Sequence, residues 1–463
     1  MKSYRLRIIC FAIVASIATI YSPAKAEHYF SLERPIALAI DSTDPEYIDS
    51  TDQALQLAIQ IGRLFGVHKH AFIITSSPYK HLSPFREGLS FIDFNRVNGF
   101  VFGLATPSFV NFGRHEELGI RGGITYGFAE HKGQSQLGGE YRIPLSSFSD
   151  TTPVELWRWV PTLALGAEYH NMTTTEDYWR ANRYENMVYA FFAREDFRDY
   201  FKIDGWNASI AFRPSLHSEI QVEYRSDIYY NQIQRVFYGR FGGNKVLPVN
   251  PPINTGRINS WVITAGDEHV MPKTTRQPNV FGDNVFLEYL KGHAFLLQAE
   301  FGTNAATSST FASYLFEAQG FAPLVTGISI DSRLRVQSST GDVPVQKLQY
   351  LGGPSTLPAF KNKVFFGNRM ALLNTELRFS LAELSSFFQA ADVQLILLND
   401  FGFLSLADSA AGVFEGFSNL STKTIAYNTG IGIGHTTGLQ LGVMFRTDVS
   451  GGDRFFFRFR RPF

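Results

Sequence analysis

The 463-residue sequence contains one cysteine, Cys10, and it lies in the first apolar stretch of the chain. Residues 1–26 open with basic side chains, continue in an apolar run and end in Ala-Lys-Ala. This order is typical of a secretory signal peptide that is removed by cleavage. The mature chain is therefore predicted to lack both disulfides and thiolate metal sites.

The rest of the chain lacks any uncharged apolar run of the ~18 residues that a membrane-spanning helix needs. It also lacks a charge bias, because Lys+Arg and Asp+Glu both number 42, and the signal peptide removes four basic residues to leave a formal charge of about −4. No basic surface points to nucleic acid as a partner. The sequence is instead rich in aromatics, with 43 Phe and 20 Tyr. A secreted, aromatic-rich chain without helical spans fits an outer-membrane β-barrel with aromatic girdles. A soluble periplasmic β-protein is the alternative.

Residues 218–230 carry the clearest strand pattern. Ile220 and Val222 alternate with Glu219 and Gln221, and the alternation continues to the end of the segment. A soluble sandwich rarely lines a whole inward face with charge, whereas a barrel with a wet lumen does. The pattern therefore favours an all-β, transmembrane antiparallel β-barrel.

Similar patterns predict about 16 strands, an even number as in single-chain bacterial barrels. They are placed at a first strand opened by residues 95–99 and then at 118–130, 135–145, 160–170, 184–194, 204–213, 218–230, 258–267, 293–304, 311–321, 328–338, 371–381, 393–403, 424–434, 439–448 and 454–463. We expect residues 27–87 to form a short periplasmic lead and residues 88–463 the barrel. Alternating strand direction then predicts short periplasmic turns at 131–133, 214–217 and 436–438, a long external loop at 232–256 and a long periplasmic connection at 268–292.

The stretch from residue 348 to residue 381 joins a long loop to a strand. The loop holds Gly352-Gly353, which tolerate backbone angles that other residues resist. In the strand, Leu373 and Leu377 alternate with Glu376 and Arg378, so the two charged side chains are predicted to face the lumen. A long ordered loop is more often functional than idle.

This stretch resembles the sixth extracellular loop and following strand of the bacterial surface antigen barrels, the outer-membrane assembly and secretion superfamily that includes BamA, TamA and FhaC. The matching residues are Gly352, Gly353, Leu357 and Phe360 in the loop, Asn374-Thr375-Glu376-Leu377-Arg378-Phe379 in the strand, and Asp400 and Gly402 in the next strand. The chain departs from the family at the loop tip, where Pro358-Ala359 replaces Arg-Gly.

The resemblance implies that the loop folds into the lumen against wall carboxylates. In the family the tip arginine makes this contact, and here Lys361 or Lys363 is expected to take part of that role toward Glu376 and Asp400. The resemblance also implies a weak seam between the first and last strands, near Gly99 and Gly103. It further implies a C-terminal aromatic signal, here Phe459 and Phe463, that the barrel-assembly machinery recognises.

The implied function is non-enzymatic insertion or translocation of proteins or lipids at the outer membrane. The family usually carries periplasmic POTRA domains, and the lead is too short for a complete one, so client capture is assigned to an unknown periplasmic partner. The alternatives are a passive pore or surface structural protein, and an outer-membrane hydrolase. His170, His269 and His435 are interpreted as isolated, neither Gly-x-Ser-x-Gly nor His-Glu-x-x-His occurs, and no cofactor or metal site is predicted.

Overall fold

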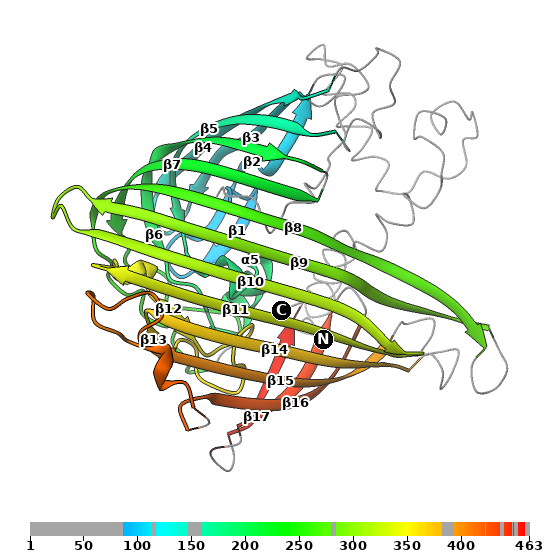
Figure 1. Cartoon of the computed structure of the whole chain (residues 1–463). Helices are drawn as coiled ribbons and strands as arrows, with labels where there is room; N and C mark the ends of the chain where they lie inside the picture. Colours follow the sequence, from blue (N-terminus) through cyan, green and yellow to red (C-terminus); the bar gives the residue numbers. More distant parts are fainter. Residues whose placement is uncertain are drawn as a thin grey trace, which may run out of the picture.

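The computed structural model describes residues 87–112, 117–146, 160–215, 217–241, 243–278, 284–381, 393–421, 423–435, 439–446, 448 and 452–458. Within these residues, sixteen strands form one antiparallel sheet that curls into a barrel-like shape (Figure 1). The expected fold and strand number are confirmed. The predicted signal peptide, nearly all of the predicted lead, Phe459 and Phe463 lie outside the described residues.

Each strand of the large sheet pairs with its neighbour in the sequence. The strands are β1 (Ile92–Asn95), β2 (Gly99–Phe112), β3 (Leu118–Gly127), β4 (Lys132–Pro144), β5 (Thr162–Thr174), β6 (Phe201–Arg213), β7 (Ser218–Asn231), β8 (Gly256–Pro278), β9 (Asn284–Asn304), β10 (Thr310–Val325), β11 (Ile328–Gly341), β14 (Arg369–Ser380), β15 (Val393–Ser405), β16 (Ala426–His435), β17 (Gln440–Arg446) and β18 (Arg454–Arg458). Two short strands, β12 (Gln349–Leu351) and β13 (Phe365–Gly367), form a separate hairpin between β11 and β14.

The strand count agrees with the sequence because two errors compensate. Residues 184–194 are not a strand, since they form the helix α5 (Arg183–Val188) and the π-helical turn η3 (Tyr189–Ala193). Asn182 starts this helix by accepting a hydrogen bond from the Tyr184 N–H, a cap that outweighs the β-propensity of the aromatic residues. The first predicted strand is in turn two strands, β1 and β2, because the Asn95 side chain accepts the Val97 and Asn98 N–H groups and so forms a turn.

The connections alternate between two ends of the barrel. The loop end carries residues 175–200, 232–255, 342–368 and 406–425, and the turn end carries residues 214–217 and 326–327. The predicted turn at 131–133 lies at the loop end, so its placement opposite the 232–256 loop was wrong. The extra strand β1 reverses the direction of the next strands relative to the prediction. Because residues 184–194 are not a strand, the strands that follow them run in the predicted direction again.

The predicted connection at 268–292 was also wrong. Strands β8 and β9 continue through it as one long hairpin, in register from Ile258↔Asn304 to Pro278↔Asn284. Its far half extends beyond β7, whose pairing with β8 ends at Ser218↔Asp267. This unusually long pair of strands was not predicted, because the composition of the segment is mixed.

The alternation predicted for residues 218–230 and 371–381 is confirmed. Glu219, Glu223, Glu376 and Arg378 are buried on the inward face, whereas Ile220 is half exposed on the outward face. Inward charges are paired across strands: Arg121 Nη2 lies 2.6 Å from Glu168 Oε2, for example. Pairing lowers the free-energy cost of removing these charges from water. The inward face can therefore be both buried and rich in charged side chains.

Five helical turns complete the described elements. Besides α5 and η3 they are the 3-10 turns η2 (Asp177–Trp179), η4 (Val345–Lys347) and η5 (Phe417–Asn419).

No helix in the described part of the chain is both long and apolar enough to cross a membrane.

Candidate functional site

The connection between β11 and β14 is folded into the lumen. It contains η4, the β12–β13 hairpin and a tip in which every residue from 351 to 360 is buried. Leu357 is fully buried and packs with Leu351, Phe360, Met370 and Leu372. We call residues 348–368 the lumen loop. Its buried apolar contacts with β14 show that it packs on the inside of the wall.

Three glycines make this packing possible. Gly352 and Gly353 have φ of +105° and +101°, which favours glycine, and a Cβ on Gly352 would lie 2.2 Å from the Lys361 carbonyl oxygen. Gly402 lies in the wall strand β15, where an added Cβ would meet Leu357 Cδ1 at 2.8 Å and Leu351 Cδ1 at 2.9 Å. The absence of a side chain at position 402 thus leaves the space that the two loop leucines fill.

Wall side chains also bind the backbone of the loop tip. Arg333 of β11 donates to the Ser355 carbonyl, and Asn374 of β14 donates to the Thr356 carbonyl at 3.0 Å. Arg458 of β18 donates to the Pro354 carbonyl at 2.6 Å. Hydrogen bonds to buried carbonyls are costly to lose, because the oxygen would remain without a partner. The tip is therefore fixed by three strands through its backbone.

The two predicted wall carboxylates are bound by wall residues. Arg458 Nη1 donates to Glu376 Oε1 at 3.1 Å, and Arg378 donates to the other oxygen of Glu376. Asp400 accepts from Asn374 at 2.6 Å and from Asn428 at 2.8 Å. The expected contact from a loop lysine to Glu376 or Asp400 was wrong. Arg458 contacts both Glu376 and the loop, so the arginine comes from the last described strand.

The two lysines of the lumen loop have different surroundings. Lys361 is exposed, whereas Lys363 Nζ lies 2.6 Å from Asp177 Oδ2 and also pairs with Asp199. Arg180 donates to Asp177 at 3.0 Å and to the Gly352 carbonyl at 2.6 Å. A second anchor therefore joins the lumen loop to the 175–200 connection. Sequence reasoning missed it because this connection was predicted to be partly a strand.

The charges of this anchor stabilise the ionised form of Asp177. Burial alone would raise the pKa of Asp177, but Lys363 and Arg180 hold it below its ordinary value of 3.8. Burial raises the pKa of Tyr350, whose ring lies 4.8 Å from Lys363 Nζ, to about 12, with Asp199 and Asp177 adding to the effect. Tyr350 is therefore neutral at physiological pH.

We expect the lumen loop to loosen in acid. Because the pKa of folded Asp177 is lowered, its contribution to docking is fully present above the ordinary carboxyl pKa and is lost as pH falls through the folded value. Limited proteolysis of the loop should give a constant rate from neutral pH to about pH 4, the ordinary range of an aspartate, and a rising rate below it. The loop of the Asp177→Asn variant should be cleaved faster at neutral pH, and its cleavage rate should rise less as the pH falls. We call this rise in rate the acid step. An acid step of unchanged size in Asp177→Asn would contradict the assignment.

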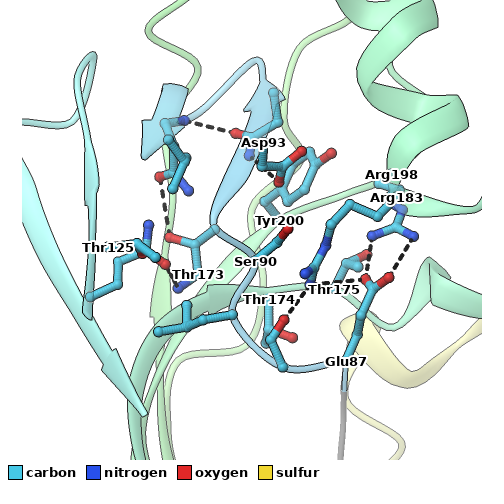
Figure 2. A pocket seen from close by; sticks show the side chains of 16 residues that line it. Glu87, Ser90, Asp93, Thr125, Thr173, Thr174, Thr175, Arg183, Arg198 and Tyr200 are labelled. Atoms are coloured by element: carbon cyan, nitrogen blue, oxygen red, sulfur yellow. Dashed lines mark hydrogen bonds and ion pairs between the residues drawn. The ribbon is translucent and has the colours of Figure 1, made fainter. Parts of the chain in front are cut away.

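Residues just before β1 dock in the lumen as well (Figure 2). Glu87 pairs with Arg198, Arg183 donates to the Gly88 carbonyl at 2.6 Å, and the Leu89 N–H donates to Gln136 at 2.8 Å. Burial would raise the pKa of Glu87, but the two arginines lower it overall.

These contacts surround a polar cavity of about 30 Å³, lined among others by Ser90, Asp93, Thr125, Thr173 and Tyr200. It is large enough for about one water molecule. Its lining includes Glu87, Arg183 and Arg198, which hold the segment before β1, so the cavity belongs to the packing of that segment.

The edge strands β1 and β18 do not pair within the described residues, and η3 lies against both of them. Phe94 of β1 packs on Phe191, with ring centroids 5.2 Å apart. On the other side, the Tyr189 hydroxyl donates to the Phe457 carbonyl and accepts from the Phe457 N–H, both at 2.9 Å. One side chain thereby satisfies the two backbone groups that a neighbouring strand would satisfy. Burial raises the pKa of Tyr189 further above its usual range, so the hydroxyl keeps its proton.

The predicted seam residues lie elsewhere. Gly103 pairs with Thr125 of β3, so it is inside the sheet, and Gly99, with φ of +65°, opens β2 after the turn from β1. Within the described residues, the edge strand at the N-terminal side of the sheet is β1, which sequence reasoning had joined to β2. Among the predicted isolated histidines, His170 is buried and its Nε2 lies 2.8 Å from Asp227 Oδ1.

Comparisons with known proteins gave structural matches only. No family model matches the sequence, and no curated protein matches it. The fold is similar to the crystal structure of BamA from Haemophilus ducreyi lacking POTRA domains 1–3, with a TM-score of 0.45 and 12% identity over 80% of this chain and 68% of that one. It is also similar to CdiB from Acinetobacter baumannii, with a TM-score of 0.35 and 9% identity over 80% of this chain. This chain covers 60% of the length of that CdiB.

Proposed function

We propose that this chain is an outer-membrane barrel that inserts or translocates proteins or lipids through its seam, without enzymatic activity. The observation that supports the proposal is the sheet edge at β18, which pairs with no strand beyond β17 within the described residues and whose Phe457 backbone is bound by the Tyr189 hydroxyl. An unpaired strand edge is a template for another extended chain. In this proposal a client strand would pair with β18 after displacing the Tyr189 hydroxyl from the Phe457 backbone.

The proposed location follows from the same features. A band of the outward face is apolar and aromatic, with Leu104, Ile124, Trp261 and Phe295 among its exposed residues, and membrane lipid would cover this band. The loop end would then face the cell exterior and the turn end the periplasm. In this proposal the signal peptide directs export, and the barrel-assembly machinery inserts the chain through its C-terminal strand.

The lumen loop has the role of a plug in this proposal. Its tip is buried, and it is fixed to the wall by Arg333, Asn374 and Arg458 and to the 175–200 connection by Lys363. A passive pore needs an open lumen, so this packing favours transport through the seam over free diffusion. Pro358-Ala359 replaces the Arg-Gly of the family at the loop tip. In this proposal the wall residues Arg333 and Arg458 supply the positive charge that the tip lacks.

Planar-bilayer conductance of the refolded chain tests this function. We expect low, flickering conductance for the intact protein and a large, steady conductance after deletion of residues 353–363, because the deletion removes the buried tip. Lys361→Ala, which changes an exposed residue of the same loop, should behave as the intact chain. A large, steady pore in the intact protein would instead support the passive channel.

A further inference from the structure

Two histidines and an aspartate from different strands meet on the outward face, near the turn end. His269 of β8 lies directly opposite His293 of β9, and Asp267 precedes His269 by two residues on the same face. His269 Nδ1 is 2.7 Å from Asp267 Oδ2, and His293 Nε2 is 3.3 Å from the same oxygen. Sequence reasoning took His269 to be isolated, and the pairing of β8 with β9 shows that this was wrong.

We propose that Asp267, His269 and His293 bind one divalent transition-metal ion of the zinc class. One ligand atom from each residue lies within 4.8 Å of the other two. Ligands at the ~2.0–2.2 Å bond lengths of tetrahedral zinc lie ~3.3 Å apart, so small side-chain rotations would bring all three into place. Two imidazoles and a carboxylate suit zinc better than the oxygen-preferring ions calcium and magnesium.

Neighbouring residues hold these ligands in position. Ser218 donates a hydrogen bond to Asp267 Oδ1, which leaves Oδ2 directed at the two histidines. The His217 ring packs on His269 with centroids 4.2 Å apart. Such contacts around a metal site fix ligand orientation and strengthen metal binding. Three protein ligands would leave a fourth position for water, as in open zinc sites.

The site would add a cross-link between two paired strands at the point where one of them loses its other neighbour. Asp267 marks the last pairing of β8 with β7, and beyond it the β8–β9 hairpin continues without that neighbour. A bound ion would reinforce the pairing of β8 with β9 beside the turn between β6 and β7. The side chains of His269 and His293 are 43% and 62% exposed, so the ion can reach them. This inference does not depend on the proposed function.

Zinc titration of the refolded full-length protein in detergent tests the site, with binding followed by calorimetry and by competition with a chromophoric chelator. We expect one Zn²⁺ per chain and an affinity at least ~10-fold weaker in His269→Ala and in His293→Gln, since each loses one of three ligands. Added Zn²⁺ should also raise the unfolding temperature of the unaltered chain, by linkage. His131→Asn, in a turn at the loop end with φ of +55°, is the matched control and should bind as the unaltered chain does.

Each result supports or overturns the site. Loss of one equivalent of bound zinc in both ligand variants, with the control unchanged, supports it. No zinc binding by the unaltered chain, or equal binding by all variants, would overturn it. His293→Gln changes a mostly exposed side chain, so it tests the site even where His269→Ala impairs folding.

Discussion

Replacing Tyr189 with phenylalanine is expected to destabilise the seam by about 1–3 kcal/mol, because two hydrogen bonds of about 0.5–1.5 kcal/mol each are lost. The hydroxyl is bound to both the N–H and the C=O of Phe457, so its removal breaks two hydrogen bonds at once. The ring remains, and its packing on Phe197, with centroids 5.0 Å apart, is unaffected. The substitution therefore isolates the role of one oxygen atom.

Heat-induced unfolding of the refolded barrel, followed by gel mobility, measures this effect. We expect the midpoint to fall in Tyr189→Phe, and bilayer conductance to fluctuate more often as the β18 edge is released. Tyr141→Phe is the matched control, because it also removes one hydroxyl but from an outward, half-exposed side chain. Equal midpoints for Tyr189→Phe and the unaltered chain would show that η3 does not hold the seam.

Replacing Gly402 with valine is expected to displace the lumen loop. The new Cβ would lie within 3 Å of Leu351 and Leu357, which are 1% and 0% exposed and so have little room to move. Overpacking of a dense core typically costs ~1–3 kcal/mol. Because the crowded atoms belong to the loop rather than to the wall, the barrel should persist while the loop becomes accessible to protease and the conductance rises.

A second substitution distinguishes local crowding from general damage. Leu357→Ala removes the crowded side chain, so it should partly restore loop protection when combined with Gly402→Val, a non-additive result expected of residues in contact. Gly320→Ala is the control, because a Cβ there meets no atom within 4 Å. If Gly402→Val leaves loop proteolysis unchanged, the loop is not held by this contact.

The Asp177–Lys363 ion pair, the packing at Gly402 and the Tyr189 hydrogen bonds lie in different parts of the molecule. Asp177 and Lys363 join the lumen loop to the 175–200 connection, Gly402 accommodates the loop on the wall, and Tyr189 connects the same connection to the last described strand. Residues 175–200 thus touch both the loop and the seam. Loosening at one of these places is therefore expected to affect the other.

The sequence by itself determined the all-β class and the inward face, whereas the predicted strand number agreed only because two errors compensate. Alternation is a local property, so residues 218–230 and 371–381 showed which side chains point to the lumen before any contact was known. The glycines at 352, 353 and 402 were also identified, although Gly402 was matched only by resemblance. The physical reason for Gly402, the space taken by Leu351 and Leu357, is a contact between distant residues.

Only the tertiary structure decided which charges meet. Lys363 pairs with Asp177 and Asp199 rather than with Glu376 or Asp400, and Arg458 rather than a loop side chain reaches Glu376. The helical segment that carries Tyr189 was predicted to be a strand, because its aromatic residues have β-propensity and its cap depends on one side chain. Ion pairs, caps and the His269–His293 pair depend on strand register and loop path, which local periodicity does not encode.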